Sequence, residues 1–193
     1  VDFGLATHPE AIIEHGYQFD FYNGGGVDIA FMGAGEIDRA GNVNVSKLAG
    51  RTPGCGGFID ITQTAKTVVF CATFSSGGLA VDVTDGALRV VREGRFPKFV
   101  PNVGQVTFSS ARATARGQRV LYVLERAVFE LTQDGIRLIE VAPGIDLERD
   151  VLGRMPFRPL VAGSPAHMPP AIFRPEPLGL ARLWDTKEPE HAD

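Results

Sequence analysis

Short apolar runs of strand length recur along the chain and alternate with helical or turn signals. "VDIAFMG" at 27–33 and "KTVVFCATF" at 66–74 are two such runs, and the second is rich in β-branched and aromatic residues. Runs of this kind are typical of buried strands. Between them, "FIDITQTA" at 58–65 places its apolar residues at helical spacing. A helix between two buried strands predicts an α/β layer.

The second half of the chain changes to an alternating pattern. "LAVDVTDGALRVV" at 79–91 alternates on both sides of Asp85-Gly86, which predicts a hairpin. "GQRVLYVLERAVFELTQDGIRLIEVA" at 117–142 predicts three more strands, the last two joined around Asp134-Gly135. This part of the sequence therefore predicts an antiparallel β insertion.

Helix signals are shorter and less uniform. "THPEAIIEHG" at 7–16 predicts a short helix from its capping-box spacing, whereas "YQFDFY" at 17–22 fits either a strand or a helical turn. "SSARATARG" at 109–117 predicts a short helix, and "GIDLERDVLGRM" at 144–155 predicts another with Asp146 as its N-cap. "DRAGNVNVS" predicts a turn followed by a short strand.

No linker separates two independent domains. We expect one α/β domain over residues 1–180, made of an open sheet with helices and the antiparallel insertion. The tail from residue 162 is rich in proline and has little periodicity, so we expect it to wrap over the domain or a neighbouring subunit. Its last part, residues 181–193, is rich in proline and charge, and we expect it to be partly disordered.

Composition excludes several classes of function. The 193 residues are 44% hydrophobic and 22% charged, and the net charge of -4 shows no basic excess for nucleic acid. No apolar run approaches the roughly 18 residues of a membrane span. Four scattered histidines and no close Cys/His pair argue against a bound metal. Cys55 and Cys71 fit two reduced thiols in a cytosolic protein better than a disulfide framework.

Two glycine clusters are the main candidates for chemistry. "RTPGCGGFID" at 51–60 leads into the predicted helix, and "FYNGGGVDIA" at 21–30 leads into the first buried strand. A glycine loop that opens a helix presents unpaired backbone N–H groups, which can hold an anion or a developing oxyanion. Neither cluster has the pattern of a P-loop or a dinucleotide fingerprint. The alternative is a tight loop that packs helix against strand.

Side-chain candidates are few. Asn44 lies inside a predicted strand, and its amide can donate to an oxyanion, although turn chemistry explains it equally well. Cys55 lies between glycines at a helix N-terminus, where a thiolate would be stabilised, but no histidine near it in sequence can serve as its base. A nucleophile is therefore not evident from local sequence.

The quoted stretches, in their order along the chain, resemble the C-terminal half of the family I coenzyme A transferases. The similarity runs from residue 2 to about residue 180, and the fused-chain acetate/propionate or 3-oxoacid enzymes are the closest group. It implies an open α/β fold of the ribose-isomerase/CoA-transferase type. It also implies a reaction in which a glutamate carries CoA as a thioester between an acyl-CoA and a second carboxylic acid.

The resemblance also implies roles for individual residues. Residues on the oxyanion or thioester side of the site would be Asn44, Gly56 and Gly57. Residues that shape the CoA and acyl pocket would be Gly24, Gly25, Gly26, Gly54 and Phe58. The family's glutamate belongs to a Glu-x-Gly motif upstream of the matching segment, and neither Glu10 nor Glu36 fits that motif.

From the resemblance we expect this chain to be inactive alone and to need the N-terminal half of the same enzyme. CoA would be a substrate and not a permanent cofactor, and the enzyme would be a cytoplasmic homo-oligomer in short-chain fatty acid or ketone body metabolism. Nucleic acid and membranes are not expected partners. The alternative is a non-catalytic CoA-binding or assembly module on the same fold; a hydrolase or isomerase variant is a weaker third reading.

Overall fold

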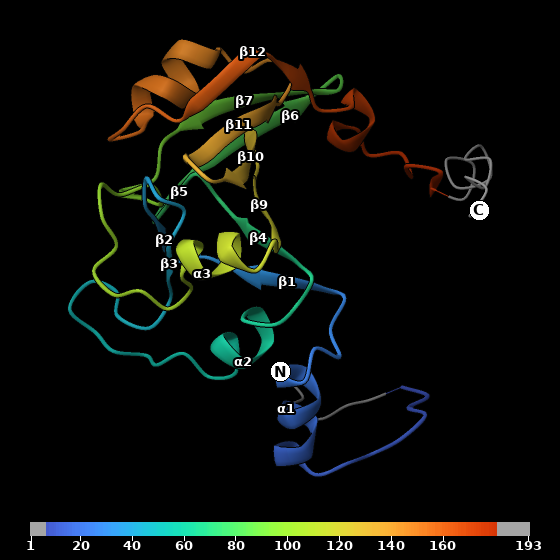
Figure 1. The fold of residues 1–193 in the computed structure, drawn as a ribbon. Coiled ribbons are helices and arrows are strands. Elements are labelled where there is room, and N and C mark those ends of the chain that lie inside the picture. Colours follow the sequence, from blue (N-terminus) through green and yellow to red (C-terminus); the bar gives the residue numbers. More distant parts are fainter. Residues whose placement is uncertain (1–6, 181–193) are drawn as a thin grey trace, which may run out of the picture.

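One six-stranded sheet carries the fold in the computed structural model, which describes residues 7–180 (Figure 1). Its strands β1, β4 and β9 are parallel, β10 runs antiparallel to β9 and β11, and β12 is parallel to β11. In spatial order the strands are β1 (Ile29–Gly33), β4 (Thr67–Ala72), β9 (Arg119–Leu124), β10 (Ala127–Thr132), β11 (Gly135–Val141) and β12 (Leu160–His167). The predicted α/β class is confirmed, and β4 is an interior strand, flanked by β1 and β9.

Three two-stranded sheets complete the β structure. They are β2 (Glu36–Ile37) with β3 (Val43–Asn44), β5 (Ser75–Ser76) with β8 (Phe96–Pro97), and β6 (Ala80–Thr84) with β7 (Ala87–Arg92). The hairpin predicted around Asp85-Gly86 is β6–β7, and both turn residues are left-handed, with φ of 53° and 80°. Such a turn matches the twist of the strands it joins.

The first helix differs from its prediction. α1 is His15–Asn23, so the helix predicted over 7–16 is wrong, and the ambiguous segment 17–22 is helical. Ile12 and Ile13 in the preceding stretch are 87% and 55% exposed, so a helix there would have no apolar face to bury. α1 instead contacts α2, and Phe19 lies against the start of that helix.

The other predicted helices form where expected, but the one at 144–155 is not an α-helix. α2 (Phe58–Thr62) and α3 (Ser110–Ala115) lie where expected. Residues 144–155 contain a π-helical turn, η1 (Leu147–Val151), followed by a 3₁₀ turn, η2 (Leu152–Arg154). Its N-cap is Asp146, as predicted, since the side-chain oxygen accepts a hydrogen bond from the Arg149 N–H at 2.7 Å.

Part of the proline-rich tail is a strand that the sequence did not reveal. β12 pairs with β11 at Leu160 and Val161 and again at Ala166 and His167, with a register shift between them. That irregularity removes the alternation by which an edge strand is recognised. The short turn η3 (Pro170–Phe173) follows. The expected tail at 181–193 lies outside the described residues.

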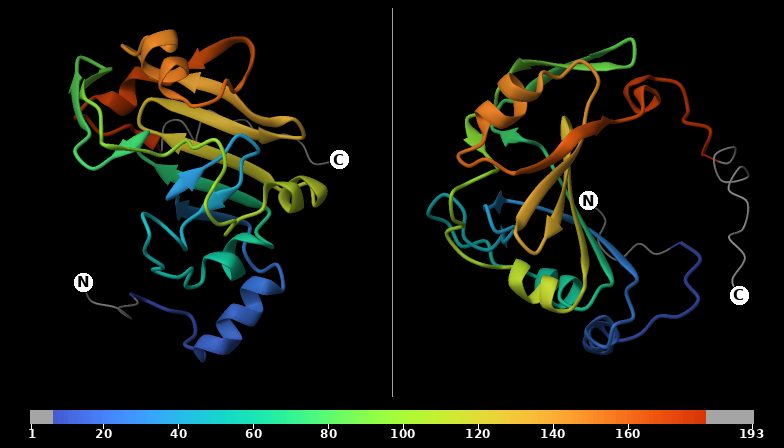
Figure 2. Two further views of the ribbon diagram at one scale, coloured as in Figure 1. Left: turned by 90° about the vertical axis from the view of Figure 1, so that its left-hand side faces the viewer. Right: turned by 45° about the horizontal axis from the view of Figure 1, so that its top comes forward.

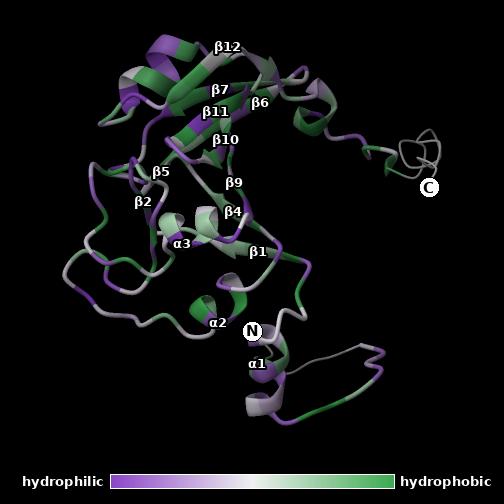
Figure 3. Cartoon of the chain, viewed as in Figure 1, coloured by the Kyte–Doolittle hydropathy of each residue, from purple (hydrophilic) through white to green (hydrophobic). Residues whose placement is uncertain are grey.

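The main core lies on one face of the sheet. α2, α3 and the β2–β3 hairpin cover this face, and Figure 2 shows the two helices on the same side of the strands. Phe70 stacks between Phe58 and Tyr122, with ring centroids 5.9 and 5.5 Å apart. The Tyr122 hydroxyl donates to the Gly41 carbonyl at 2.5 Å, and burial raises the pKa of Tyr122. In Figure 3 the green of β1 and of part of α2 marks their hydrophobic residues.

Candidate functional site

The carboxyl ends of the three parallel strands lie along one edge of the sheet. β1 leads into Ala34 and Gly35, β4 leads into Phe74, and β9 leads into Glu125 and Arg126. In open α/β sheets, ligands bind outside this edge. A ligand site is therefore expected at this edge.

The loop "GCGG" precedes α2, which leads to the start of β4, and it shares a hollow with Ser46 and Lys47, which follow β3. Gly54 and Gly56 have φ of 86° and 52°, a left-handed backbone that only glycine adopts at low cost. The Phe58 N–H donates to the Cys55 carbonyl at 3.0 Å, which closes the turn before the helix. Cys55 and Cys71 are free thiols, as the sequence predicts.

A hollow of about 270 Å³ lies beside the glycine loop. Three separate segments line it: the loop itself, the turn after β3, and the segment before α3. Its lining comprises Ser46, Lys47, Thr52, Gly54, Cys55, Ile59, Gln105, Val106 and Thr107. Asn44 fixes the second of these segments, because its side-chain oxygen accepts hydrogen bonds from the N–H groups of Ser46 and Lys47, each at 3.1 Å.

Asn44 is fully buried, and its side chain is saturated with hydrogen bonds. Its amide nitrogen donates to Glu36 Oε2 and to the Lys47 carbonyl, both at 2.7 Å. An amide nitrogen has two hydrogens, and both are therefore in use. Asn44 can donate to a ligand only by releasing one of these partners. The structure gives it a clear positioning role, because it ties Glu36 to the turn that lines the hollow.

A carboxylate and an ammonium flank the end of β1. Glu36 Oε2 also receives a long hydrogen bond, 3.4 Å, from the Gly104 N–H. The Lys98 ammonium donates to the Ala34 carbonyl at 3.0 Å. Burial lowers the pKa of Lys98, and the charge of Glu36 opposes this shift. Sequence reasoning missed Lys98; the only signal was a single cation inside the apolar run "FPKFV".

A buried arginine holds the ends of β4 and β9 together. Arg126 has no exposed side-chain surface; it pairs with Glu93 at 2.6 Å and Glu125 at 2.7 Å, and it lies over the Phe74 ring at 4.7 Å. Burial alone would raise the pKa of Glu93, but hydrogen bonds from Arg126 and Ser75 outweigh it and lower the pKa. The network is structural, since its groups are paired with one another.

Gly57 has a packing function that the sequence did not indicate. A Cβ atom at this position would lie 2.6 Å from the Phe19 ring, so glycine is what allows α1 to contact the loop. At Gly54 and Gly56 an added Cβ would meet no atom within 4 Å. Packing against Phe19 therefore explains why position 57 is a glycine, whereas the backbone at Gly54 and Gly56 is open on the Cβ side.

Of the predicted site residues, Gly54 alone is in the lining of this hollow; Asn44, Gly56 and Gly57 are next to lining residues in the chain or one residue away. Gly24, Gly25 and Gly26 end α1 and lead into β1, so they lie toward the amino ends of the parallel strands. Phe58 is 5% exposed and belongs to the core. The structure does not bring these residues to the glycine loop's hollow, and their CoA-binding role stays a prediction.

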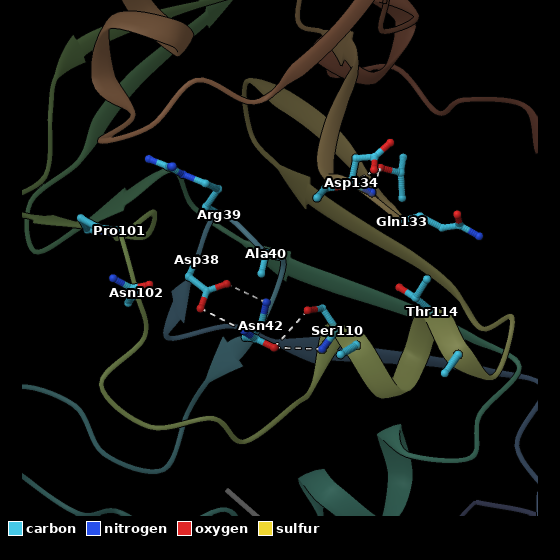
Figure 4. A pocket seen from close by; sticks show the side chains of 14 residues that line it. Asp38, Arg39, Ala40, Asn42, Pro101, Asn102, Ser110, Thr114, Gln133 and Asp134 are labelled. Atoms are coloured by element: carbon cyan, nitrogen blue, oxygen red, sulfur yellow. Dashed lines mark hydrogen bonds between the residues drawn. The ribbon is translucent and has the colours of Figure 1, made fainter.

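A larger hollow, about 780 Å³, lies elsewhere on the covered face (Figure 4). The turn at 38–42, α3 and the tip of the β10–β11 hairpin line it. Several of its polar groups pair with one another: Asn42 donates to Asp38, and its side-chain oxygen accepts from Ser110 (Figure 4). None of the predicted site residues lines this hollow. Size alone therefore does not locate the site.

Within residues 7–180, no group of three or more His, Cys, Asp or Glu side chains is arranged to hold a metal ion. In the same part of the chain, no helix has the length and apolarity needed to cross a bilayer.

Comparisons with known proteins give consistent matches. Acetate CoA-transferase YdiF of Escherichia coli (strain K12) is 43% identical over 179 residues, which cover 93% of this chain and 34% of that protein. Caffeate CoA-transferase of Acetobacterium woodii is 44% identical over 177 residues, covering 89% of this chain and 34% of the relative. No protein-family model matches the chain.

Solved structures agree with these sequence matches. The apoenzyme of acyl-CoA transferase YdiF from Escherichia coli O157:H7 has a TM-score of 0.87 at 42% identity, covering 91% of this chain and 34% of that chain. Its thioester complex with CoA has a TM-score of 0.84 at 44% identity, over 86% of this chain and 32% of that chain. This chain thus spans about a third of the length of the curated relatives it matches.

Proposed function

Because the chain belongs to the family I coenzyme A transferases, we propose that it forms part of an enzyme that moves CoA between an acyl-CoA and a carboxylic acid. The observation that carries the proposal is the identity of 43% to an acetate CoA-transferase over 93% of the chain. The chain matches about a third of that relative, so the activity belongs to a larger polypeptide or assembly that includes it.

The proposed reaction passes through a glutamate outside this chain. Its carboxylate attacks the acyl carbon of acyl-CoA, and CoA thiolate leaves to give a mixed anhydride. The thiolate then attacks the glutamyl carbonyl and expels the first carboxylic acid, which leaves a glutamyl-CoA thioester. A second acid reverses these steps, accepts CoA and frees the glutamate. Each attack creates a tetrahedral oxyanion that needs hydrogen-bond donors.

The contribution of this chain is the wall beside the thioester. The glycine loop supplies backbone N–H groups at a helix N-terminus, at the edge where an open sheet binds ligands. We assign oxyanion donation to the backbone at Gly56 and Gly57. Asn44 has both amide hydrogens committed, so we assign it to holding Glu36 and the lining turn in place.

Further parts of the proposal rest on the resemblance. Gly24 to Gly26, Gly54 and Phe58 would shape the CoA and acyl pocket, and Phe58 would act through core packing because it is buried. CoA is the substrate, and no permanent cofactor is expected. A short-chain acid substrate, a homo-oligomer and a cytoplasmic location also belong to the proposal.

The direct test is an exchange assay with isotopically labelled acetate and propionyl-CoA. This chain alone should form no labelled acetyl-CoA, whereas addition of the remaining polypeptide of the transferase should start exchange. Hydroxylamine should then inactivate the enzyme by converting the thioester to a hydroxamate. Exchange by this chain alone, or none in the complete enzyme with any short-chain acid, would contradict the proposal. The second outcome would favour a non-catalytic CoA-binding module.

A further inference from the structure

Lys98 is a half-buried cation at the edge of the sheet where ligands are expected. β1 and β4 lie side by side and parallel, and their carboxyl ends lead into Ala34 and Phe74 (Figure 1). The backbone of Lys98 connects these ends, because its N–H donates to the Phe74 carbonyl at 3.1 Å and its carbonyl accepts from the Ile37 N–H at 2.8 Å. The next residue, Phe99, is 1% exposed and belongs to the main core. Lys98 is therefore held in place on both sides before any ligand binds.

The ammonium of Lys98 has hydrogen-bonding capacity left. An ammonium carries three hydrogens, and one of them is donated to the Ala34 carbonyl at 3.0 Å. Within residues 7–180, Lys98 forms no salt bridge with an Asp or Glu side chain. Arg126, at the ends of β4 and β9, is also withdrawn from solvent but pairs with two carboxylates. Because a charge is seldom buried without a partner of opposite sign, the contrast indicates that Lys98 takes its partner from outside the described residues.

Glu36 does not fully compensate the charge of Lys98. Its Oε2 atom accepts from the Asn44 amide at 2.7 Å and from the Gly104 N–H at 3.4 Å. The charge of Glu36 raises the pKa of Lys98, but burial lowers it by more, so the pKa of Lys98 lies below its ordinary value. An anion placed beside this ammonium would therefore be stabilised, and it would stabilise the ammonium in return.

We propose that the ammonium of Lys98 binds the carboxylate of the acid that accepts CoA. The inference rests on the proposed function, since that reaction brings a free carboxylic acid to the site. At neutral pH the acid is a carboxylate, which accepts hydrogen bonds from an ammonium. Lys98 orients this carboxylate, one of whose oxygens then bonds to the glutamyl carbonyl carbon as CoA thiolate leaves. The ammonium keeps its protons throughout.

A carboxylate fits this position better than a phosphate group of CoA. The Ala34 carbonyl oxygen already contacts the ammonium, and the charge of Glu36 acts on the same region. Each further negative charge is repelled by Glu36, and in a partly buried site this repulsion is poorly screened. A carboxylate brings one negative charge, whereas a phosphate monoester brings nearly two. The repulsion therefore selects the carboxylate.

Single-turnover kinetics of the complete enzyme separate binding of the acid from the chemical step. The glutamyl-CoA thioester is formed first, and its reaction with labelled acetate is then followed as a function of acetate concentration. Lys98→Met, which keeps the length of the side chain without its charge, should raise the half-saturating acetate concentration by about 10–100-fold. In thioester formation, the half-saturating concentration of propionyl-CoA should stay within about threefold of the wild-type value, because the acyl-CoA brings no free carboxylate.

Two further variants serve as controls. Lys98→Arg restores a cation and should bind acetate more tightly than Lys98→Met does. Lys66→Met removes an exposed lysine that pairs with Asp28 just before β4, and it should leave both half-saturating concentrations unchanged. An equal shift for acetate and propionyl-CoA in Lys98→Met, or a fall in the limiting rates alone, would indicate a structural role and overturn the proposal.

A second measurement uses the unaltered enzyme, so it does not depend on how a variant folds. Trifluoroacetate is a carboxylate too weakly nucleophilic to accept CoA, and it should occupy the acid site of the thioester form without turnover. At about ten times its dissociation constant, it should slow reductive methylation of Lys98 about tenfold, as measured on the Lys98 peptide by mass spectrometry. Inorganic phosphate at the same concentration and ionic strength should not. Equal protection by phosphate, or none by trifluoroacetate, would contradict the proposal.

These experiments separate the role of Lys98 from the reaction itself. A complete enzyme that forms no thioester from any acyl-CoA would refute the proposed function, and the role of Lys98 with it. Normal thioester formation and CoA transfer, with the same acetate dependence in Lys98→Met as in the wild type, would refute only the role of Lys98.

Discussion

The pair Asn44–Glu36 allows a quantitative test of how Asn44 contributes to the site. Asn44→Asp keeps the shape of the side chain but replaces the donor that faces Glu36 and the Lys47 carbonyl, each 2.7 Å away, with an acceptor. The loss of a hydrogen bond to a charged group costs about 1.5–3 kcal/mol. With the Lys47 carbonyl also unpaired, we expect Asn44→Asp to lower the free energy of unfolding by about 3–4 kcal/mol.

Glu36→Gln supplies the compensating change. In the double variant, the amide introduced at position 36 can donate to the carboxylate introduced at position 44, which restores the pair with donor and acceptor exchanged. Urea unfolding of wild type, both single variants and the double variant should give a coupling energy of about 2 kcal/mol in favour of the double variant. Single-variant effects that add within about 0.5 kcal/mol would refute the reasoning.

The same four proteins, each assembled with the rest of the enzyme, distinguish positioning from direct catalysis. If Asn44 positions Glu36 and the lining turn, the double variant should regain most of the activity that Asn44→Asp loses. If its amide donates to the oxyanion, kcat should fall by about 10²–10³ in both proteins that carry Asn44→Asp. The structure favours the first result, because both amide hydrogens are already donated within the protein.

Three other sets of contacts carry predictions of their own. Gly56→Ala and Gly50→Ala both place a Cβ on a left-handed backbone, with no other atom within 4 Å of the added carbon. Each should therefore lower the free energy of unfolding by about 1 kcal/mol, but only Gly56→Ala should lower the rate of CoA exchange. Equal exchange rates in the two variants would exclude the glycine loop from the site. Glu93→Gln should destabilise the fold by about 1.5–3 kcal/mol at pH 7. Because Arg126 helps hold the pKa of Glu93 below its ordinary 4.5, this difference should shrink as the pH falls below 4.5, and a difference constant from pH 7 to pH 3 in urea unfolding would contradict it. Tyr122→Phe removes a buried hydrogen bond and should lower the free energy of unfolding by about 1–3 kcal/mol without changing the rate of CoA exchange. A loss of exchange at unchanged stability would contradict a structural role for Tyr122.

Local sequence predicted an element correctly where one physical signal dominated. The β-branched run of β4 and the Asp-Gly turn of β6–β7 both fold as predicted. The start of α1 and the strand β12 did not follow from local sequence, because contacts with distant segments decide them. α1 forms where Phe19 can pack on Gly57, and β12 pairs with β11 despite its irregular register.

In the candidate site, too, local sequence identified individual residues but not the contacts between distant ones. The two glycine clusters look alike in sequence, but Gly24–Gly26 precede the strand β1 and Gly54–Gly57 precede the helix α2, as their flanking residues predicted. Asn44 was recognised, but its partner Glu36 becomes visible only once the hairpin pairs the two residues. Lys98 is distant in sequence from the end of β1 that it contacts, so no local pattern could assign it.

The most direct test of the central claim is the location of the covalent CoA adduct. The complete enzyme should be incubated with acyl-CoA, quenched in acid and digested, and the peptides carrying the added mass of CoA identified by mass spectrometry. We predict an adduct on a glutamate outside the 193 residues of this chain, and none on Glu36 or any other residue within it. An adduct on Glu36 would contradict the account, because the nucleophile would then belong to this chain.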